Sequence, residues 1–145
     1  MATRTAQAQW LGTLREGEGS LSFGGFSGPY SFASRFETGP GTNPEELIGA
    51  AHAGCFSMAL AGMLTQAGHP PQRIRTTARV HINLVDGHHT INRIELDTEG
   101  QVPGLDEPAF QEFAEQAKRS CPVSRALAGV PEITLQARLA GPVTA

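Results

Sequence analysis

The chain has 145 residues, of which 39% are apolar and 17% are charged, and its formal net charge is −3. This length and composition are those of one globular domain with a hydrophobic core, and they exclude a disordered chain. The basic residues are scattered along the sequence, so we expect neither a nucleic acid nor a membrane surface as a partner.

Residues 1–10 lack the apolar core of a signal peptide. We expect no membrane-spanning helix, since no window approaches the ~20 apolar residues that one requires, and we therefore expect a cytoplasmic protein. The chain contains only two cysteines, Cys55 and Cys121. In a reducing compartment such cysteines more often serve redox or metal chemistry than a structural disulfide. The pair is therefore the first candidate for function.

Alternating side chains predict a strand over residues 5–14, a turn over 15–19 and a return strand through Leu21 and Phe23. A glycine-rich loop then leads to a short strand predicted over residues 30–36, which is anchored by aromatic side chains.

A long helix is predicted from Pro44 to about Gln66. Asn43 is a good N-cap, and Glu46 can bond back to it. Gly68 and the prolines after it end the helix. Because the helix is apolar on every side after its first turn, we expect it to be buried all round. Its many small residues suit either tight packing against a sheet or close approach of a second copy, and both remain open.

Residues 76–85 alternate and then reach the turn dipeptide Asp86-Gly87, which predicts a hairpin with a second strand around residues 90–98. Four residues of the first strand are expected to face the core: Ala78, Val80, Ile82 and Leu84. A helix over 108–118, a short helix starting at Cys121-Pro122 and a last strand over 133–139 complete the chain. The prediction is an α+β fold with mainly antiparallel sheets around one long buried helix, in a single domain over residues 1–145.

Cys55 lies in the middle of the long helix, where the helix dipole contributes little to a thiolate. A reactive thiolate at Cys55 would therefore need a cation from elsewhere, and the candidates are Arg15, Arg35 and Arg73. The alternative is a small apolar cysteine that packs in the core.

Cys121 directly precedes Pro122, which suits the first position of a helix. Cys121 is then the N-cap, where backbone amides and the helix dipole favour a thiolate. The alternative is a break between two helices in which the thiol has no role.

His52 precedes Cys55 by three residues, so it is either a base for a cysteine nucleophile or a hydrogen-bonded core residue. No close pairs of cysteines or histidines with zinc-site spacing occur, and we expect no metal. Glu45 suits the positive end of the helix. Glu45 also lies about 15 Å along the helix from Cys55, too far to serve that thiol within one chain.

Taken together, these segments resemble the OsmC/Ohr family of osmotically inducible and organic hydroperoxide resistance proteins. The resemblance covers nearly the whole chain, and its strongest parts are residues 34–37, 41–60 and 121–124. Residues 41–60 carry the specific motif, since Cys-Pro alone is weak. His52 resembles the osmotically inducible branch, because the other branch typically has an aromatic residue there.

The resemblance implies a thiol peroxidase that works as an intertwined homodimer in oxidative and osmotic stress defence, with organic hydroperoxides as substrates. In the resemblance, Cys55 matches the peroxidatic cysteine and Cys121 the resolving one. Arg35 matches the arginine that steadies the thiolate, and Glu45 the carboxylate that orients Arg35. No cofactor is implied, only an external dithiol reductant such as a dihydrolipoyl group.

The expected chemistry is a sulfenic acid at Cys55 followed by a Cys55–Cys121 disulfide. We expect an apolar pocket near Cys55, with Phe56 and Met58 beside it. If Glu45 belongs to the site, the distance along the helix suggests that it comes from the partner chain. Two other functions remain open: a cysteine hydrolase or acyltransferase that uses Cys55 and His52, and a non-enzymatic small-molecule-binding domain.

Overall fold

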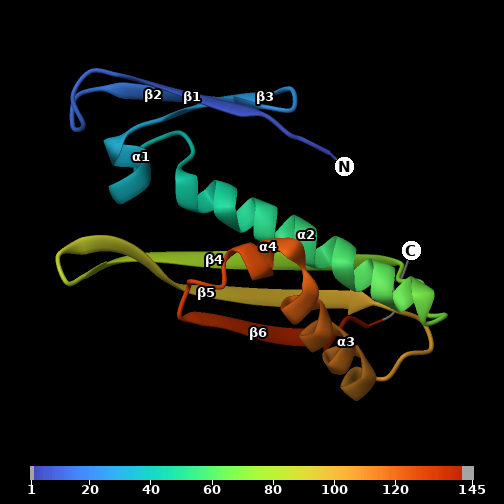
Figure 1. The fold of residues 1–145 in the computed structure, drawn as a ribbon. Helices are drawn as coiled ribbons and strands as arrows, with labels where there is room; N and C mark the ends of the chain where they lie inside the picture. The colour runs from blue at the N-terminus through green and yellow to red at the C-terminus, as the bar shows by residue number, and fades with distance from the viewer. Residues whose placement is uncertain (1, 142–145) are drawn as a thin grey trace. The chain divides into compact units, whose positions relative to one another are not determined.

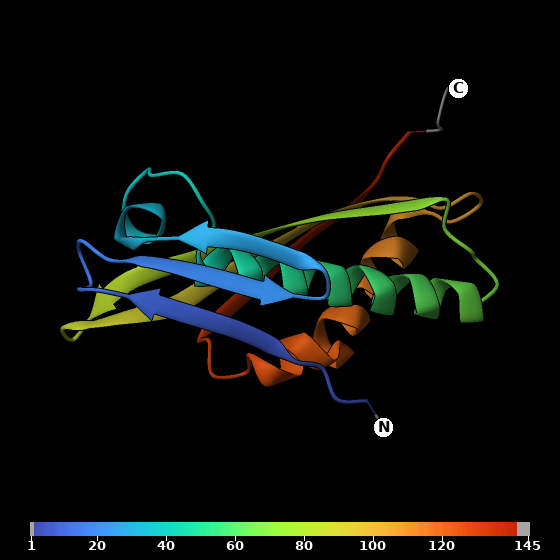
Figure 2. The ribbon, with the colours of Figure 1, turned by 90° about the horizontal axis from the view of Figure 1, so that it is seen from above.

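The computed structural model describes residues 2–141 and divides the chain into two compact units, one up to Leu47 and one from Ile48 onward. The first unit contains strands β1 (Ala6–Leu11), β2 (Glu18–Phe23) and β3 (Phe26–Tyr30). They form an antiparallel sheet in the order β1-β2-β3, visible at the blue end of the colour scale in Figure 1 and from above in Figure 2.

The segment predicted as a glycine-rich loop is in part a strand. Phe23 pairs with Phe26 across a two-residue turn, in which Gly24 and Gly25 have φ angles of 52° and 84°. Positive φ at both positions is the requirement of a tight hairpin turn that matches strand twist. The two glycines therefore close a β2–β3 hairpin, and the prediction of a loop was wrong over β3.

The prediction of a strand over residues 30–36 was also wrong, because five of these seven residues form the one-turn helix α1 (Phe32–Phe36). Ser31 caps this helix, and a reciprocal pair of hydrogen bonds joins Ser31 and Ser34. Phe32 and Phe36 lie one helical turn apart with their ring centroids at 5.1 Å. The capping pair and the i,i+4 aromatic contact favour a helix over the strand that alternation suggested.

Helix α2 (Pro44–Gln66) has the predicted bounds. The Asn43 Oδ1 accepts a hydrogen bond from the Glu46 amide at 2.8 Å, and the Asn43 Nδ2 donates to the Glu46 carboxylate at 2.9 Å. The cap at Asn43 is thus confirmed, but Glu46 bonds the side-chain amide of Asn43 instead of the backbone amide that a capping box would use.

The expectation that α2 is buried all round was wrong for the single chain. Its buried positions recur every three or four residues, at Glu45, Gly49, His52, Phe56, Leu60 and Leu64. The opposite face is exposed and carries small residues together with Met58, which is 77% exposed. A helix with apolar side chains all round thus leaves an apolar face uncovered in one chain.

By length and composition α2 could cross a membrane, contrary to our expectation that no segment could. Its side chains Phe56, Leu60 and Leu64 are fully buried in the hydrophobic core of the second unit. We therefore describe α2 as a core helix.

The second unit contains a sheet of β4 (Arg73–Val85), β5 (His88–Gln101) and β6 (Glu132–Leu139). The β4–β5 hairpin is antiparallel as predicted, whereas β6 runs parallel to β5. Helices α3 (Glu107–Ser120) and α4 (Pro122–Ala126) form the connection from β5 to β6 (Figure 1). The predominantly antiparallel α+β class is thus as predicted.

The core of this unit joins α2, α3 and one face of the sheet. Its fully buried side chains include Phe56, Leu60, Ile94 and Phe110. Leu84 was predicted to face this core but is 68% exposed. The strand register shifts between His81 and Ile82, so the alternation of β4 does not continue unbroken to the hairpin tip.

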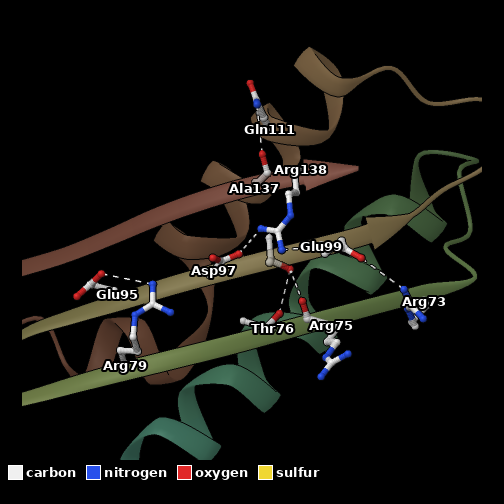
Figure 3. A network of polar contacts seen from close by, with 11 residues as sticks. Arg73, Arg75, Thr76, Arg79, Glu95, Asp97, Glu99, Gln111, Ala137 and Arg138 are labelled. Carbon is white, nitrogen blue, oxygen red and sulfur yellow. Dashed lines mark hydrogen bonds and ion pairs between the residues drawn. The ribbon is translucent and has the colours of Figure 1, made fainter. Parts of the chain in front are cut away.

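The other face of the sheet carries a network of ion pairs (Figure 3). Arg138 of β6 binds both Asp97 and Glu99 of β5, and Arg73 and Arg79 of β4 bind Glu99 and Glu95. These positions alternate with the buried ones along each strand, which explains why the sheet has one apolar and one charged face.

Candidate functional site

The two cysteines, 66 residues apart in the sequence, lie in contact. Cys55 lies on α2, and Cys121 is the N-cap of α4, as its proline predicted. Their sulfur atoms are 2.9 Å apart, and both thiols are free. Cys121 is fully buried and Cys55 is partly exposed. A solute can therefore reach Cys55 more readily than Cys121.

The two thiols differ in acidity. Burial raises the pKa of Cys55, and the neighbouring Cys121 raises it further. Burial also raises the pKa of Cys121, but the Cys55 thiol and the polar groups of Ser124 and Val123 outweigh this effect, so the pKa of Cys121 is lowered. The Cys121 side chain makes no cap hydrogen bond, and its sulfur contacts that of Cys55. Within this pair, Cys121 carries the charge more easily.

Arg35 and Glu45 form an ion pair within the first unit. The Arg35 Nε and Nη2 donate to the Glu45 carboxylate, with nitrogen–oxygen distances of 3.1 and 2.8 Å to Oε1. The Glu45 side chain is 8% exposed and that of Arg35 is 37% exposed. This two-pronged contact fixes the plane of the guanidinium group. The pairing expected from the family resemblance is therefore present.

His52 bonds to a residue that sequence reasoning did not single out. The side chain of His52 is fully buried, and its Nε2 lies 2.6 Å from the Ser124 Oγ, while its Nδ1 has no hydrogen-bond partner. Burial lowers the pKa of His52, which keeps the ring neutral. The sequence signal for Ser124 was its place at the end of the 121–124 segment of the family resemblance, three residues after Cys121. Since the Nε2 of His52 is bonded to Ser124, this geometry does not support His52 as a base for Cys55.

The other arginines considered for Cys55 have different partners. The Arg15 guanidinium lies 4.6 Å from the centroid of the Phe32 ring, and Arg73 binds Glu99. Of the expected pocket residues, Phe56 is fully buried in the core and Met58 points to solvent. Within residues 2–141, no group of three His, Cys, Asp or Glu side chains could hold a metal ion.

Comparison with known proteins gives a consistent family match. A family model described as OsmC-like protein matches residues 37–136. The chain is 48% identical to peroxiredoxin OsmC of Escherichia coli over 141 residues, which cover 94% of this chain and 96% of that protein. It is 34% identical to an organic hydroperoxide resistance protein of Xanthomonas axonopodis over 98 residues, 67% of each chain.

Solved structures match the fold. The crystal structure of an OsmC-like protein from Mycoplasma pneumoniae has a TM-score of 0.75 at 19% identity, and the match covers 97% of this chain and 99% of that one. The organic hydroperoxide resistance protein OhrB of Bacillus subtilis has a TM-score of 0.69 at 25% identity, over 94% of this chain and 98% of that one.

Proposed function

Since the chain belongs to the OsmC family, as its motifs predicted, we propose that it is a cysteine-based peroxidase that reduces organic hydroperoxides to alcohols. The observation that carries this proposal is the contact between Cys55 and Cys121, whose sulfur atoms are 2.9 Å apart. A sulfenic acid on one of them would be within reach of the other thiol without a large movement of the chain.

The proposed reaction has two steps and needs no cofactor. The Cys55 thiolate attacks the terminal oxygen of the hydroperoxide, the O–O bond breaks, and the alkoxide that leaves takes up a proton. Cys55 is then a sulfenic acid. The Cys121 thiolate attacks the Cys55 sulfur, so an S–S bond forms, the S–O bond breaks, and hydroxide leaves and is protonated to water. The two thiols supply both protons.

An external dithiol completes the cycle by reducing the disulfide and becoming a disulfide itself. A dihydrolipoyl group is the reductant that the family resemblance suggests. We place this cycle in the cytoplasm, where thiols are kept reduced, as part of the defence against oxidative and osmotic stress.

Cys55 needs a cation for the first step, because its pKa is raised by burial and by Cys121. We assign this role to Arg35, held by Glu45. The ion pair supports the assignment because a buried carboxylate that bonds two nitrogens of the guanidinium group orients it firmly.

We further propose that the active unit is a homodimer in which Arg35 and Glu45 of one chain serve Cys55 of the other. Glu45 precedes Cys55 by ten residues on one unbroken helix, so the two are about 15 Å apart along its axis. The exposed face of α2 supports this proposal, because a second copy of the chain could pack against it. An added Cβ at Gly54 or Gly62 would meet no atom within 4 Å, so packing within the chain does not require these glycines.

The test is to add one equivalent of cumene hydroperoxide to the reduced protein and to measure the Cys55–Cys121 disulfide by mass spectrometry. Cys55→Ser should abolish peroxide consumption, because a serine hydroxyl is far harder to deprotonate at neutral pH than a thiol. Cys121→Ser should allow one turnover, after which Cys55 is over-oxidised to sulfinic acid. Undiminished multiple-turnover activity of Cys121→Ser would refute the two-cysteine scheme.

A further inference from the structure

Two neighbouring side-chain contacts join α2 to α4. Cys55 contacts Cys121, and His52, three residues earlier on α2, contacts Ser124, three residues later in the chain than Cys121. The sulfur–sulfur distance is 2.9 Å and the Nε2–Oγ distance is 2.6 Å. His52 and Cys121 are fully buried and Ser124 is 8% exposed. The proposed chemistry uses only the cysteine contact and leaves the second one unexplained.

The direction of the second contact follows from the atom that lacks a partner. His52 is neutral, so one of its two ring nitrogens carries the proton. If Nδ1 carried it, a buried donor would be orphaned, whereas a buried acceptor without a partner is the more common case. The favoured tautomer therefore has the proton on Nε2, which donates to the Ser124 Oγ. The Ser124 hydroxyl hydrogen is then free to point at another acceptor.

We propose that the hydrogen bond between His52 and Ser124 is a clamp that holds Cys121 against Cys55 for disulfide formation. His52 and Ser124 are thus positioning residues for the second step, and this assignment rests on the proposed peroxidase function. Helix α4 has five residues and makes no side-chain cap bond at Cys121. A helix of one turn has little stability of its own, so tertiary contacts must set the place of the resolving sulfur.

The same contact acts on the thiolate that performs the second step. The groups that act on the Cys121 sulfur, besides burial, are the Cys55 thiol, the amide and hydroxyl of Ser124 and the amide of Val123. With Nε2 of His52 as donor to its oxygen, Ser124 can direct its hydroxyl hydrogen at this sulfur. Donation to a thiolate favours the charged form, which is the attacking form.

The first experiment separates the two chemical steps in Ser124→Ala. One equivalent of cumene hydroperoxide is mixed with the reduced protein, and quenched samples are analysed for sulfenic acid trapped by dimedone, for disulfide and for sulfinic acid. The rate of peroxide loss should stay within about twofold of wild type. The rate of disulfide formation should fall about tenfold or more, because small misplacements of reacting atoms are costly. With excess peroxide, sulfinic acid at Cys55 should accumulate.

The chain offers a matched control in Ser57→Ala. Ser57 also lies on α2 and donates a hydrogen bond of 2.8 Å, but its partner is Thr76 of β4 instead of a residue of α4. Ser57→Ala removes a tether of the same chemistry, and both steps should keep their wild-type rates.

Two variants at position 52 keep the test independent of the folding of Ser124→Ala. His52→Leu removes the donor and should slow disulfide formation as Ser124→Ala does. His52→Gln offers an amide N–H near the position of Nε2 and should restore most of the rate. The double variant His52→Leu/Ser124→Ala should be no slower than either single variant, because both remove one contact.

Equal rates of disulfide formation in wild type, Ser124→Ala and His52→Leu would refute the clamp and leave the proposed peroxidase function standing. Equally slow His52→Gln and His52→Leu would also overturn it, since only the donor distinguishes them in this role. If wild type forms no Cys55–Cys121 disulfide, the proposed function itself fails, and the clamp fails with it.

Discussion

The pKa values of the two thiols are shifted in opposite directions, which suits them to different steps of the proposed reaction. Cys121 has a lowered pKa and is buried, so it suits a nucleophile that attacks a neighbour inside the protein. Cys55 is partly exposed, but its pKa is raised, so contact with solvent alone does not make it reactive. A peroxidatic Cys55 therefore depends on a cation, and the identity of that cation decides whether the proposed mechanism holds.

We expect Arg35→Ala to slow alkylation of Cys55 by iodoacetamide about tenfold at neutral pH, because loss of a nearby cation raises a thiol pKa by about one unit. The rate should recover as the pH is raised. Measurement in a Cys121→Ser background isolates the one thiol. Arg35→Lys should rescue poorly, because an ammonium group lacks the planar fork that Glu45 holds.

A matched control is Arg73→Ala, which removes an arginine that binds Glu99 on the charged face of the sheet. Its alkylation profile should equal that of the parent protein. If Arg35→Ala leaves the profile unchanged, another group stabilises the thiolate.

His52 makes stability depend on pH. Its pKa is lowered by burial from 6.5, so below pH 6.5 the unfolded chain binds a proton that the folded chain does not. The contribution of His52 to stability is therefore complete above pH 6.5. As the pH falls below that value, the free energy of unfolding should fall by up to about 1.4 kcal/mol per pH unit, until the lowered pKa of the folded state is reached.

Urea unfolding at several pH values measures this slope, and His52→Gln should flatten it. An identical slope in His52→Gln and wild type would show that His52 is not protonated on unfolding.

Helix α2 carries Glu45 and Cys55, which we propose as site residues, and it also contributes to the core of the second unit. Its buried face supplies Phe56, Leu60 and Leu64, and its first turn holds Glu45. The start of the helix is fixed by Asn43, whose side chain bonds Glu46 and also donates to the Ser34 carbonyl oxygen at 3.0 Å. The cap thereby ties α2 to α1, the helix that carries Arg35.

We expect Asn43→Ala to lower the free energy of unfolding by about 0.5–2 kcal/mol, the usual cost of losing an N-cap. Asn43→Asp keeps the oxygen that accepts from the Glu46 amide but loses the donor to the Ser34 carbonyl oxygen and to the Glu46 carboxylate. Asn43→Asp should lower the free energy of unfolding by less than Asn43→Ala does, because the capping oxygen is retained. Urea denaturation gives both values, and equal stability of Asn43→Ala and wild type would contradict the assignment of Asn43 as a stabilising cap.

In the proposed homodimer, each site is complete only after two chains have assembled. Arg35 and Glu45 are bonded to each other, so in the proposed mechanism they act on a thiol together, whichever chain supplies it. If they act across a dimer interface, two variants with impaired activity can complement each other. A heterodimer of Cys55→Ser and Arg35→Ala would hold both lesions in one site and leave the other site intact.

We expect about half of the wild-type activity per heterodimer after subunit exchange, measured as consumption of cumene hydroperoxide with a dithiol reductant. Each variant alone, taken through the same exchange procedure, is the control. Activity should also return with Glu45→Ala in place of Arg35→Ala, since the two residues work as a pair. If mixing restores nothing although heterodimers form, each site is built from one chain.

Local features of the sequence were sufficient to predict many of the helices and strands and the two cysteines of the site. The cap residues and the prolines predicted both ends of α2 and the start of α4 at Cys121, because helix ends are determined by groups within a few residues. Alternation and the Asp86-Gly87 turn predicted the β4–β5 hairpin. The chemical rarity of cysteine identified Cys55 and Cys121, and the family motif implied their pairing.

Other features were not predicted, in one case because a local pattern was ambiguous and in the others because tertiary packing decided them. The prediction of a strand over residues 30–36 failed because Phe32 and Phe36 fit an alternating and a helical pattern, and the Ser31–Ser34 cap favours the helix. An apolar helix does not show which of its faces its own chain covers, so the exposed face of α2 could not be predicted. His52 and Ser124 are 72 residues apart, and their bond exists only because α4 packs on α2. Sequence patterns encode local geometry, whereas a contact between distant residues depends on how all the elements pack together.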